Sequence, residues 1–158
     1  MALSLQTRVA FDALIVSVVV PELKGRGYRK HGLRWTRSVD KTNLSIRVQR
    51  EARGRMFDEV LFTFRFEVRT PDVTLVGGIG ALMLEPRDLW WRVHAGVLSR
   101  SVGLPRLEPD LVEYEIADAV GRVGDTIDTL SSTAAVRALV EKHAALVERG
   151  LLQLTERR

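Results

Sequence analysis

The spacing of hydrophobic residues changes twice along the chain, from a helical period to a period of two and back to a helical period. Ser4 is placed to cap a first helix, and Gly25 and Gly27 to end it, while Pro21 predicts a kink or a separate turn. The apolar positions of this helix share one face: Phe11, Leu14, Ile15, Val18 and Val19. An amphipathic N-terminal helix is therefore expected.

Alternation with a period of two then predicts strands over about residues 28–39, 44–49 and 61–69. Residues 40–43 have the types found in hairpin turns, so we expect the first two strands to pair. The apolar side chains of all three strands should share the face covered by helices. Its central members are Phe62, Phe64, Phe66, Trp35, Leu44 and Ile46.

The middle of the chain is rich in glycine and less regular. The glycines of Gly77–Gly80 are not followed by the lysine and hydroxyl residue of a phosphate-binding loop. They predict instead a strand bulge or close packing of the backbone. A further strand is expected over about residues 89–96, where Trp90, Arg92 and His94 share one side.

Helical spacing returns in the C-terminal part, over about residues 110–155. Asp110 is placed to cap a helix that ends near Leu130, and Ser132 or Thr133 to cap a second one that runs from Ala134 to near Leu154. The expected fold class is α+β. We predict an antiparallel sheet of about four to five strands, with the N-terminal and C-terminal helices packed mainly on one face. The length of 158 residues fits a single domain, 1–158.

Charge is distributed unevenly between two parts of the chain. From Lys24 to Arg55 there are 11 Lys or Arg against two acids, a net charge of +9. The rest has 13 against 18, which gives −5. Such asymmetry attracts anionic partners and raises association rates.

The strand alternation places several of these cations on the sheet face opposite the core. An aromatic, an imidazole and four guanidinium groups are the candidate anion-binding or partner-binding set: Arg34, Arg47, Arg65, Trp90, Arg92 and His94. The alternative for each arginine is a solvated side chain with no binding role.

Other chemistry finds little support. The chain has no cysteine, its three histidines lack ligand spacing, and its serines lie in no nucleophile motif, so no catalytic residue, metal site or cofactor is predicted. The apolar run near the start is interrupted by Asp12 and is shorter than the ~20 residues of a membrane span. We expect no membrane association and a cytoplasmic location.

One resemblance can be stated on specific segments. The junction LKGRGYRKHGLRWTR, the alternating FTFRFEV and the segment IGALMLEPRDLWWRV, all within about residues 21–93, resemble the bacterial family called domain of unknown function 4304. Gly78 stands where that family is expected to carry an arginine. The resemblance implies a fold but no established activity, substrate or catalytic residue.

These observations favour a non-enzymatic interaction module, in the class of an immunity or regulatory protein, whose basic sheet face binds an acidic protein. The alternative is a nucleic-acid-binding module in which the arginines contact phosphates and Trp90 stacks on a base. An enzyme with a site assembled from distant residues is a third reading. A homodimer formed through an edge strand is also a prediction.

Overall fold

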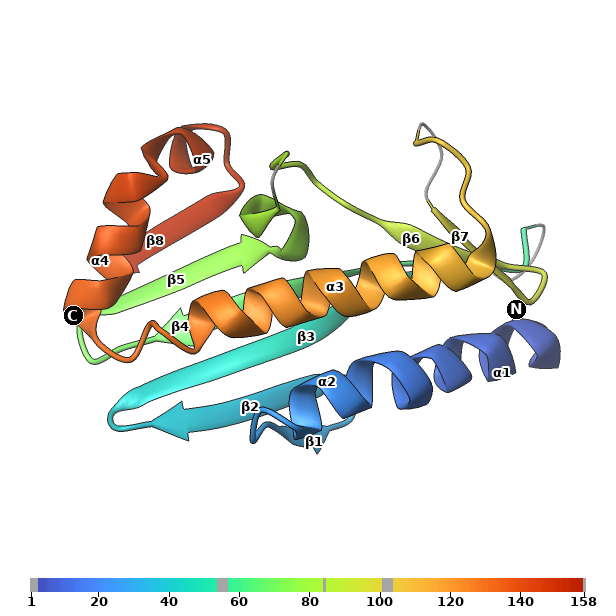
Figure 1. Cartoon of the computed structure of the whole chain (residues 1–158), viewed down its shortest axis with the longest axis horizontal. Helices are drawn as coiled ribbons and strands as arrows, with labels where there is room; N and C mark the ends of the chain where they lie inside the picture. Colours follow the sequence, from blue (N-terminus) through green and yellow to red (C-terminus); the bar gives the residue numbers. More distant parts are fainter. Residues whose placement is uncertain (1–2, 54–56, 84, 101–103, 158) are drawn as a thin grey trace.

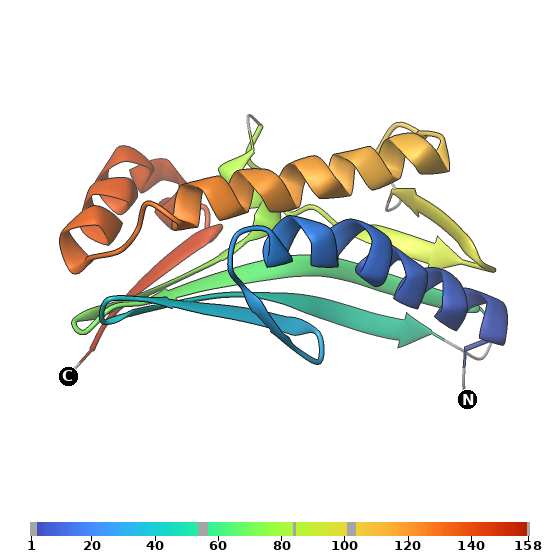
Figure 2. The same cartoon turned by 60° about the horizontal axis from the view of Figure 1, so that its bottom comes forward.

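The helices lie on one face of a single antiparallel sheet, and the other face is open (Figures 1 and 2). A computed structural model describes residues 3–53, 57–83, 85–100 and 104–157. The sheet has eight strands: β1 Arg29–His31, β2 Arg34–Val39, β3 Thr42–Arg53, β4 Glu59–Arg69, β5 Val73–Gly78, β6 Trp91–His94, β7 Val97–Arg100 and β8 Leu152–Glu156.

The helices come from the two ends of the chain. They are α1 Leu5–Leu14, a π-helical segment η1 Ile15–Val19, α2 Val20–Lys24, α3 Pro109–Ile127, α4 Thr133–Lys142 and α5 Ala144–Glu148, with a short 3-10 turn η2 Ile79–Leu82 between them. Figure 1 shows α3 and the N-terminal helices crossing the sheet side by side. Ser4 caps α1 as predicted, since its Oγ accepts a hydrogen bond from the Thr7 N–H at 3.1 Å.

The core lies between these helices and the sheet. Phe62, Phe64 and Phe66 of β4 are at most 1% exposed, and the Phe11 ring of α1 meets the Phe62 ring edge-on at 5.3 Å. Trp35, Leu44 and Ile46 are buried on the same face. The predicted core face is confirmed.

Strand β4 organises the open face, because it has different neighbours along its two halves. It pairs with β3 over its whole length. On its other side, residues 65–69 pair with β5, whereas residues 59–62 pair with β6. The open face therefore has two zones, one over β1–β5 and one around β6 and β7.

The predicted sheet of four to five strands is wrong, since the structure has eight. Strand β1 is only three residues long, too short to show a period. Strand β5 contains Gly77 and Gly78, which carry no apolar side chain. Gly77 is nevertheless required there, because a Cβ would lie 2.7 Å from the Phe66 ring.

The predicted C-terminal helix to Leu154 is also wrong. Helix α4 ends at Lys142, α5 ends at Glu148, and Gly150 then takes a φ of +75° that reverses the chain into β8. Ser132 does cap α4, accepting from the Ala135 N–H. Asp110 is not the cap of α3, which begins at Pro109 and ends three residues before Leu130.

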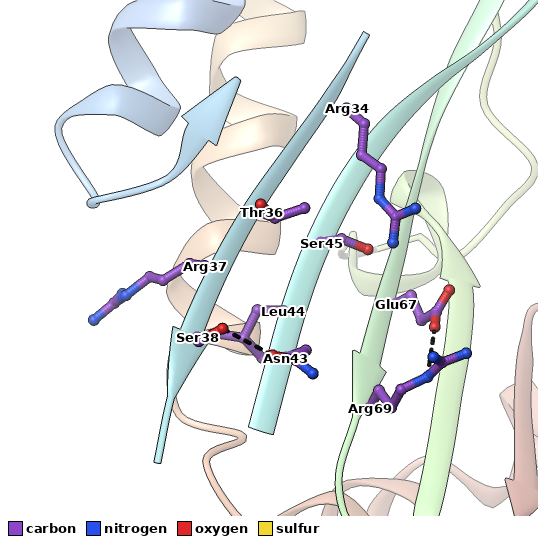
Figure 3. Close-up of a pocket in the computed structure, with 9 residues that line it drawn as sticks. All are labelled: Arg34, Thr36, Arg37, Ser38, Asn43, Leu44, Ser45, Glu67 and Arg69. Carbon is purple, nitrogen blue, oxygen red and sulfur yellow. Dashed lines mark hydrogen bonds and ion pairs between the residues drawn. The ribbon is translucent and has the colours of Figure 1, made fainter. Parts of the chain in front are cut away.

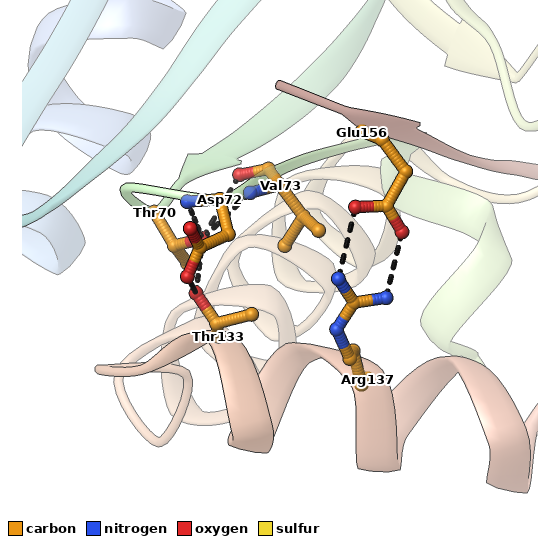
Figure 4. Close-up of polar contacts among 6 residues, drawn as sticks. All are labelled: Thr70, Asp72, Val73, Thr133, Arg137 and Glu156. Atoms are coloured by element: carbon orange, nitrogen blue, oxygen red, sulfur yellow. Dashed lines mark hydrogen bonds and ion pairs between the residues drawn. The ribbon is translucent and has the colours of Figure 1, made fainter. Parts of the chain in front are cut away.

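Helix α4 is tied to the edge of the sheet by polar contacts (Figure 4). Arg137 donates two hydrogen bonds to the Glu156 carboxylate of β8, at 2.7 and 2.9 Å. Thr133 donates to the Thr70 hydroxyl at 2.8 Å, and that hydroxyl accepts from the Val73 N–H. These contacts hold α4 over β5 and β8.

Candidate binding surface

The open face over β1–β5 is built by the strand residues that alternate with the core. Because side chains on a strand point to opposite faces in turn, the register of the strands determines which open-face residues are neighbours. The neutral polar side chains at these positions are Thr36, Ser38, Asn43, Ser45, Gln49, Thr63 and Thr74. The cations stand among these neutral polar groups.

Three arginines lie directly opposite one another across three strands. Arg34 of β2 pairs in register with Arg47 of β3, and Arg47 pairs with Arg65 of β4. We call Arg34, Arg47 and Arg65 the arginine row. His31 of β1 is opposite Arg34 at one end, and Gly78 of β5 is opposite Arg65 at the other.

The described part of the chain places no carboxylate in contact with the arginine row. Among the residues that the structure describes, no carboxylate lies within 4.0 Å of the three guanidinium groups. Glu67, the acid nearest in register, is 3.4 Å from Nε of Arg69. Like charges directly opposite each other destabilise a sheet, so this arrangement has a cost in folding.

A shallow depression of about 240 Å³ lies beside the row (Figure 3). Arg34, Ser45 and Glu67 contribute to its lining. Arg37 also borders it, but its side chain points away from the other residues in Figure 3 and bonds Asp128, the C-cap residue of α3, at 2.9 Å.

The strands that carry His31 and Arg34 are anchored to α3 by a polar cluster. Asp128 accepts from Arg37 at 2.9 Å and from the Tyr28 hydroxyl at 3.3 Å, and Arg26 bonds Asp125 at 2.6 Å. Burial, followed by the nearby Asp128 carboxylate, raises the pKa of Tyr28 above its usual range. The cluster fixes β1 and β2 beneath the helices.

Arg92 and His94 are not part of the arginine row. Both lie on β6, where Arg92 is opposite Leu61, four residues before Arg65 along β4 and so ~13 Å away. Arg92 is also neutralised, because Nη1 is 3.3 Å from Glu59 Oε1 and Nε donates to the Ser99 hydroxyl at 3.0 Å. The predicted set is therefore split between the two zones.

A second depression lies in this other zone, between β6, β7 and the segment that leads to α3. Besides Arg92 and His94, it is lined by Ser99, Arg100 and Arg106. Arg100 is bonded to Glu115 of α3, which also accepts from the Trp91 indole at 2.9 Å. Two of its three arginines thus have structural ion pairs.

Trp90 stands just before β6 and is half-buried, between the buried Leu89 and Trp91. It is not a member of any described strand. No open-face position of strands β1–β5 within the described part of the chain carries Phe, Tyr or Trp. The row has no aromatic stacking platform beside it.

The sequence did not reveal the register of the row, nor its ends His31 and Gly78. A turn over residues 40–43 would have placed Arg34 opposite Gln49. The structure instead has a two-residue turn at Asp40 and Lys41, with Asp40 at a φ of 52°. The residue type of Asp40 could have indicated this turn, because Asp is one of the residues that tolerate a positive φ in two-residue hairpin turns.

Other kinds of site are not found. Residues 3–53, 57–83, 85–100 and 104–157 contain no group of three or more His, Asp or Glu that could hold a metal ion. Within the same residues, none of the helices combines the length and the apolar character needed to cross a membrane.

Comparison with protein-family models, with curated proteins and with solved structures finds no match to this chain. The resemblance to domain of unknown function 4304 therefore stays a prediction.

Proposed function

We propose that this protein is a non-enzymatic binding module whose open sheet face binds an acidic protein through the arginine row. One observation carries the proposal. Arg34, Arg47 and Arg65 are opposite one another in register and have no acidic partner among the described residues, although such repulsion lowers stability. Functional sites commonly keep features that cost stability, and a bound carboxylate cluster would relieve this one.

The ion pairs of other arginines support a binding role for the row. Two arginines near α3 do have carboxylate partners, Asp125 for Arg26 and Asp128 for Arg37. These carboxylates give the two cations a structural role. On the open face no described carboxylate contacts the row, and a partner would supply them.

A nucleic acid is the second candidate, because three unpaired guanidinium groups can also neutralise phosphates. Among the described residues, the open face of β1–β5 carries none of the aromatic residues with which sheets stack bases, and Glu67 beside the row is paired with Arg69. We therefore favour a protein partner. An immunity or regulatory role in the cytoplasm would fit such a module.

Titration with model polyanions tests the proposal. The wild-type protein should bind poly-L-glutamate at low salt more tightly than a single-stranded oligonucleotide of similar charge. The variant Arg34→Gln, Arg47→Gln, Arg65→Gln should bind poly-L-glutamate about tenfold more weakly or worse, with a shallower salt dependence.

A matched variant removes the same charge elsewhere. Arg8, Lys41 and Lys142 are exposed and distant from the row, and their joint replacement by Gln should change affinity by no more than about twofold. If both variants lose the same affinity for poly-L-glutamate, the binding depends on net charge and not on the arginine row. Tighter binding of the oligonucleotide would favour the nucleic-acid function instead.

A further inference from the structure

The direction of the arginine row limits the shape of what can bind it. The row crosses the strands, with one cation on each strand, so its members are ~4.8 Å apart at the backbone. With His31 it covers four strands and ~14 Å. A ligand that follows the charges must run across the sheet.

The end of the row on β5 is unobstructed. Gly78 is opposite Arg65, and a Cβ built on it would meet only one atom within 4 Å, Nη1 of Arg65 at 4.0 Å. No side chain at this position blocks a ligand that leaves Arg65 towards β5. Gly78 therefore adds no side chain that would cover this end of the row.

The row is narrow as well as straight. The next open-face positions on one side are opposite one another in register and ~7 Å along the strands from the row: Arg29, Thr36, Ser45 and Glu67. Glu67 is 3.4 Å from Nε of Arg69, and this ion pair carries no net charge on the β4 side. A helix, ~10 Å wide, would overlie this neutral pair, whereas an extended chain fits within the row.

Resting on the proposed function, we infer that the partner presents an extended acidic segment whose carboxylates stand on alternate residues. Side chains on the same side of an extended chain repeat every ~6.7 Å, so three alternate carboxylates span ~13 Å, close to the ~14 Å from His31 to Arg65. Consecutive acidic residues would direct about half of their carboxylates away from the sheet.

Two peptides of identical composition and charge test this inference. A blocked octapeptide that alternates Glu and Ser should bind at least about fivefold more tightly than one with four Glu followed by four Ser. The Arg34→Gln, Arg47→Gln, Arg65→Gln variant should lose this preference. Affinities come from calorimetry or fluorescence anisotropy at low salt, and circular dichroism checks the fold.

A gain-of-function variant gives a second test, should the triple variant fail to fold. Gly78 has an extended backbone and open space, so Gly78→Arg should fold and lengthen the row to β5. It should tighten binding of the alternating peptide by about threefold and leave the block peptide nearly unchanged.

Each outcome separates the inference from the function beneath it. Equal affinities of the two peptides, lost together in the triple variant, would overturn the extended segment and keep the acidic partner. A preference that persists in the triple variant would overturn the role of the row. If poly-L-glutamate and both peptides fail to bind the wild-type protein, the inference and the proposed function both fall.

Discussion

Two adjacent residues of β4 show the difference between the faces of the sheet. Phe64 is fully buried beneath the helices and packs against Phe62 and Trp91. Arg65, the next residue, faces the open side and continues the arginine row. The covered face is buried by other parts of the chain, whereas no described carboxylate contacts the row. The difference indicates which face needs a partner.

The largest effect should follow from a change on the covered face. Phe64→Ala leaves a cavity in a fully buried cluster and should lower the free energy of unfolding by about 3–5 kcal/mol. Urea denaturation measures it. The folded fraction should still bind poly-L-glutamate. A loss below about 1 kcal/mol would contradict the central place of Phe64 in the core.

An intermediate effect should follow at the cluster that anchors β2. Asp128→Asn removes the carboxylate shared by Arg37 and Tyr28, and should cost about 1–2 kcal/mol of unfolding free energy. The control is Asp125→Asn, because that side chain is 72% exposed and its ion pair should contribute less than about 1 kcal/mol. Equal losses in the two variants would contradict the anchoring role of Asp128.

A smaller effect should appear at alkaline pH. Because burial raises the pKa of Tyr28 in the folded state, its contribution to stability is intact below the unfolded pKa of about 10 and is lost as pH rises above it. Urea denaturation from pH 8 to 11 should show this decline. Tyr28→Phe should flatten it, and an unchanged slope would show that other groups cause the decline.

The smallest effect on stability should come from the row itself. Arg47→Gln removes the central charge between Arg34 and Arg65, so the unfolding free energy should stay constant or rise by up to about 0.5 kcal/mol. Arg122→Gln makes the same replacement at a paired arginine, 2.9 Å from Asp118, and should lower it slightly. Marked destabilisation by Arg47→Gln would make that arginine structural.

The sequence predicted the faces of the sheet better than its extent. In β4, phenylalanine alternates with polar residues, and a period of two is sufficient to assign each side chain to a face. Strand β8 was missed because a short apolar segment after a helix fits either period, and only Gly150 marks the break. Strand β5 was missed because its glycines have no side chain to show alternation.

The candidate site was predicted only in part, for a related reason. Alternation placed Arg34, Arg47 and Arg65 on one face, but which residues are opposite one another depends on the turn at Asp40 and Lys41. A shift of the turn by one residue at each end preserves the faces and changes every pair. Arg92 is apart from the row because β6 pairs with residues 59–62 of β4, and these two strands are distant in sequence.

The most direct test of the account compares arginine side chains on the two faces in one NMR titration. On addition of a Glu-Ser octapeptide at low salt, the Nε–H signals of Arg34, Arg47 and Arg65 should shift together. Those of Arg37 and Arg100, already bonded to Asp128 and Glu115, should stay in place. Shifts confined to the helix-covered side, with the row unmoved at saturating peptide, would contradict the assignment of the open face as the binding surface.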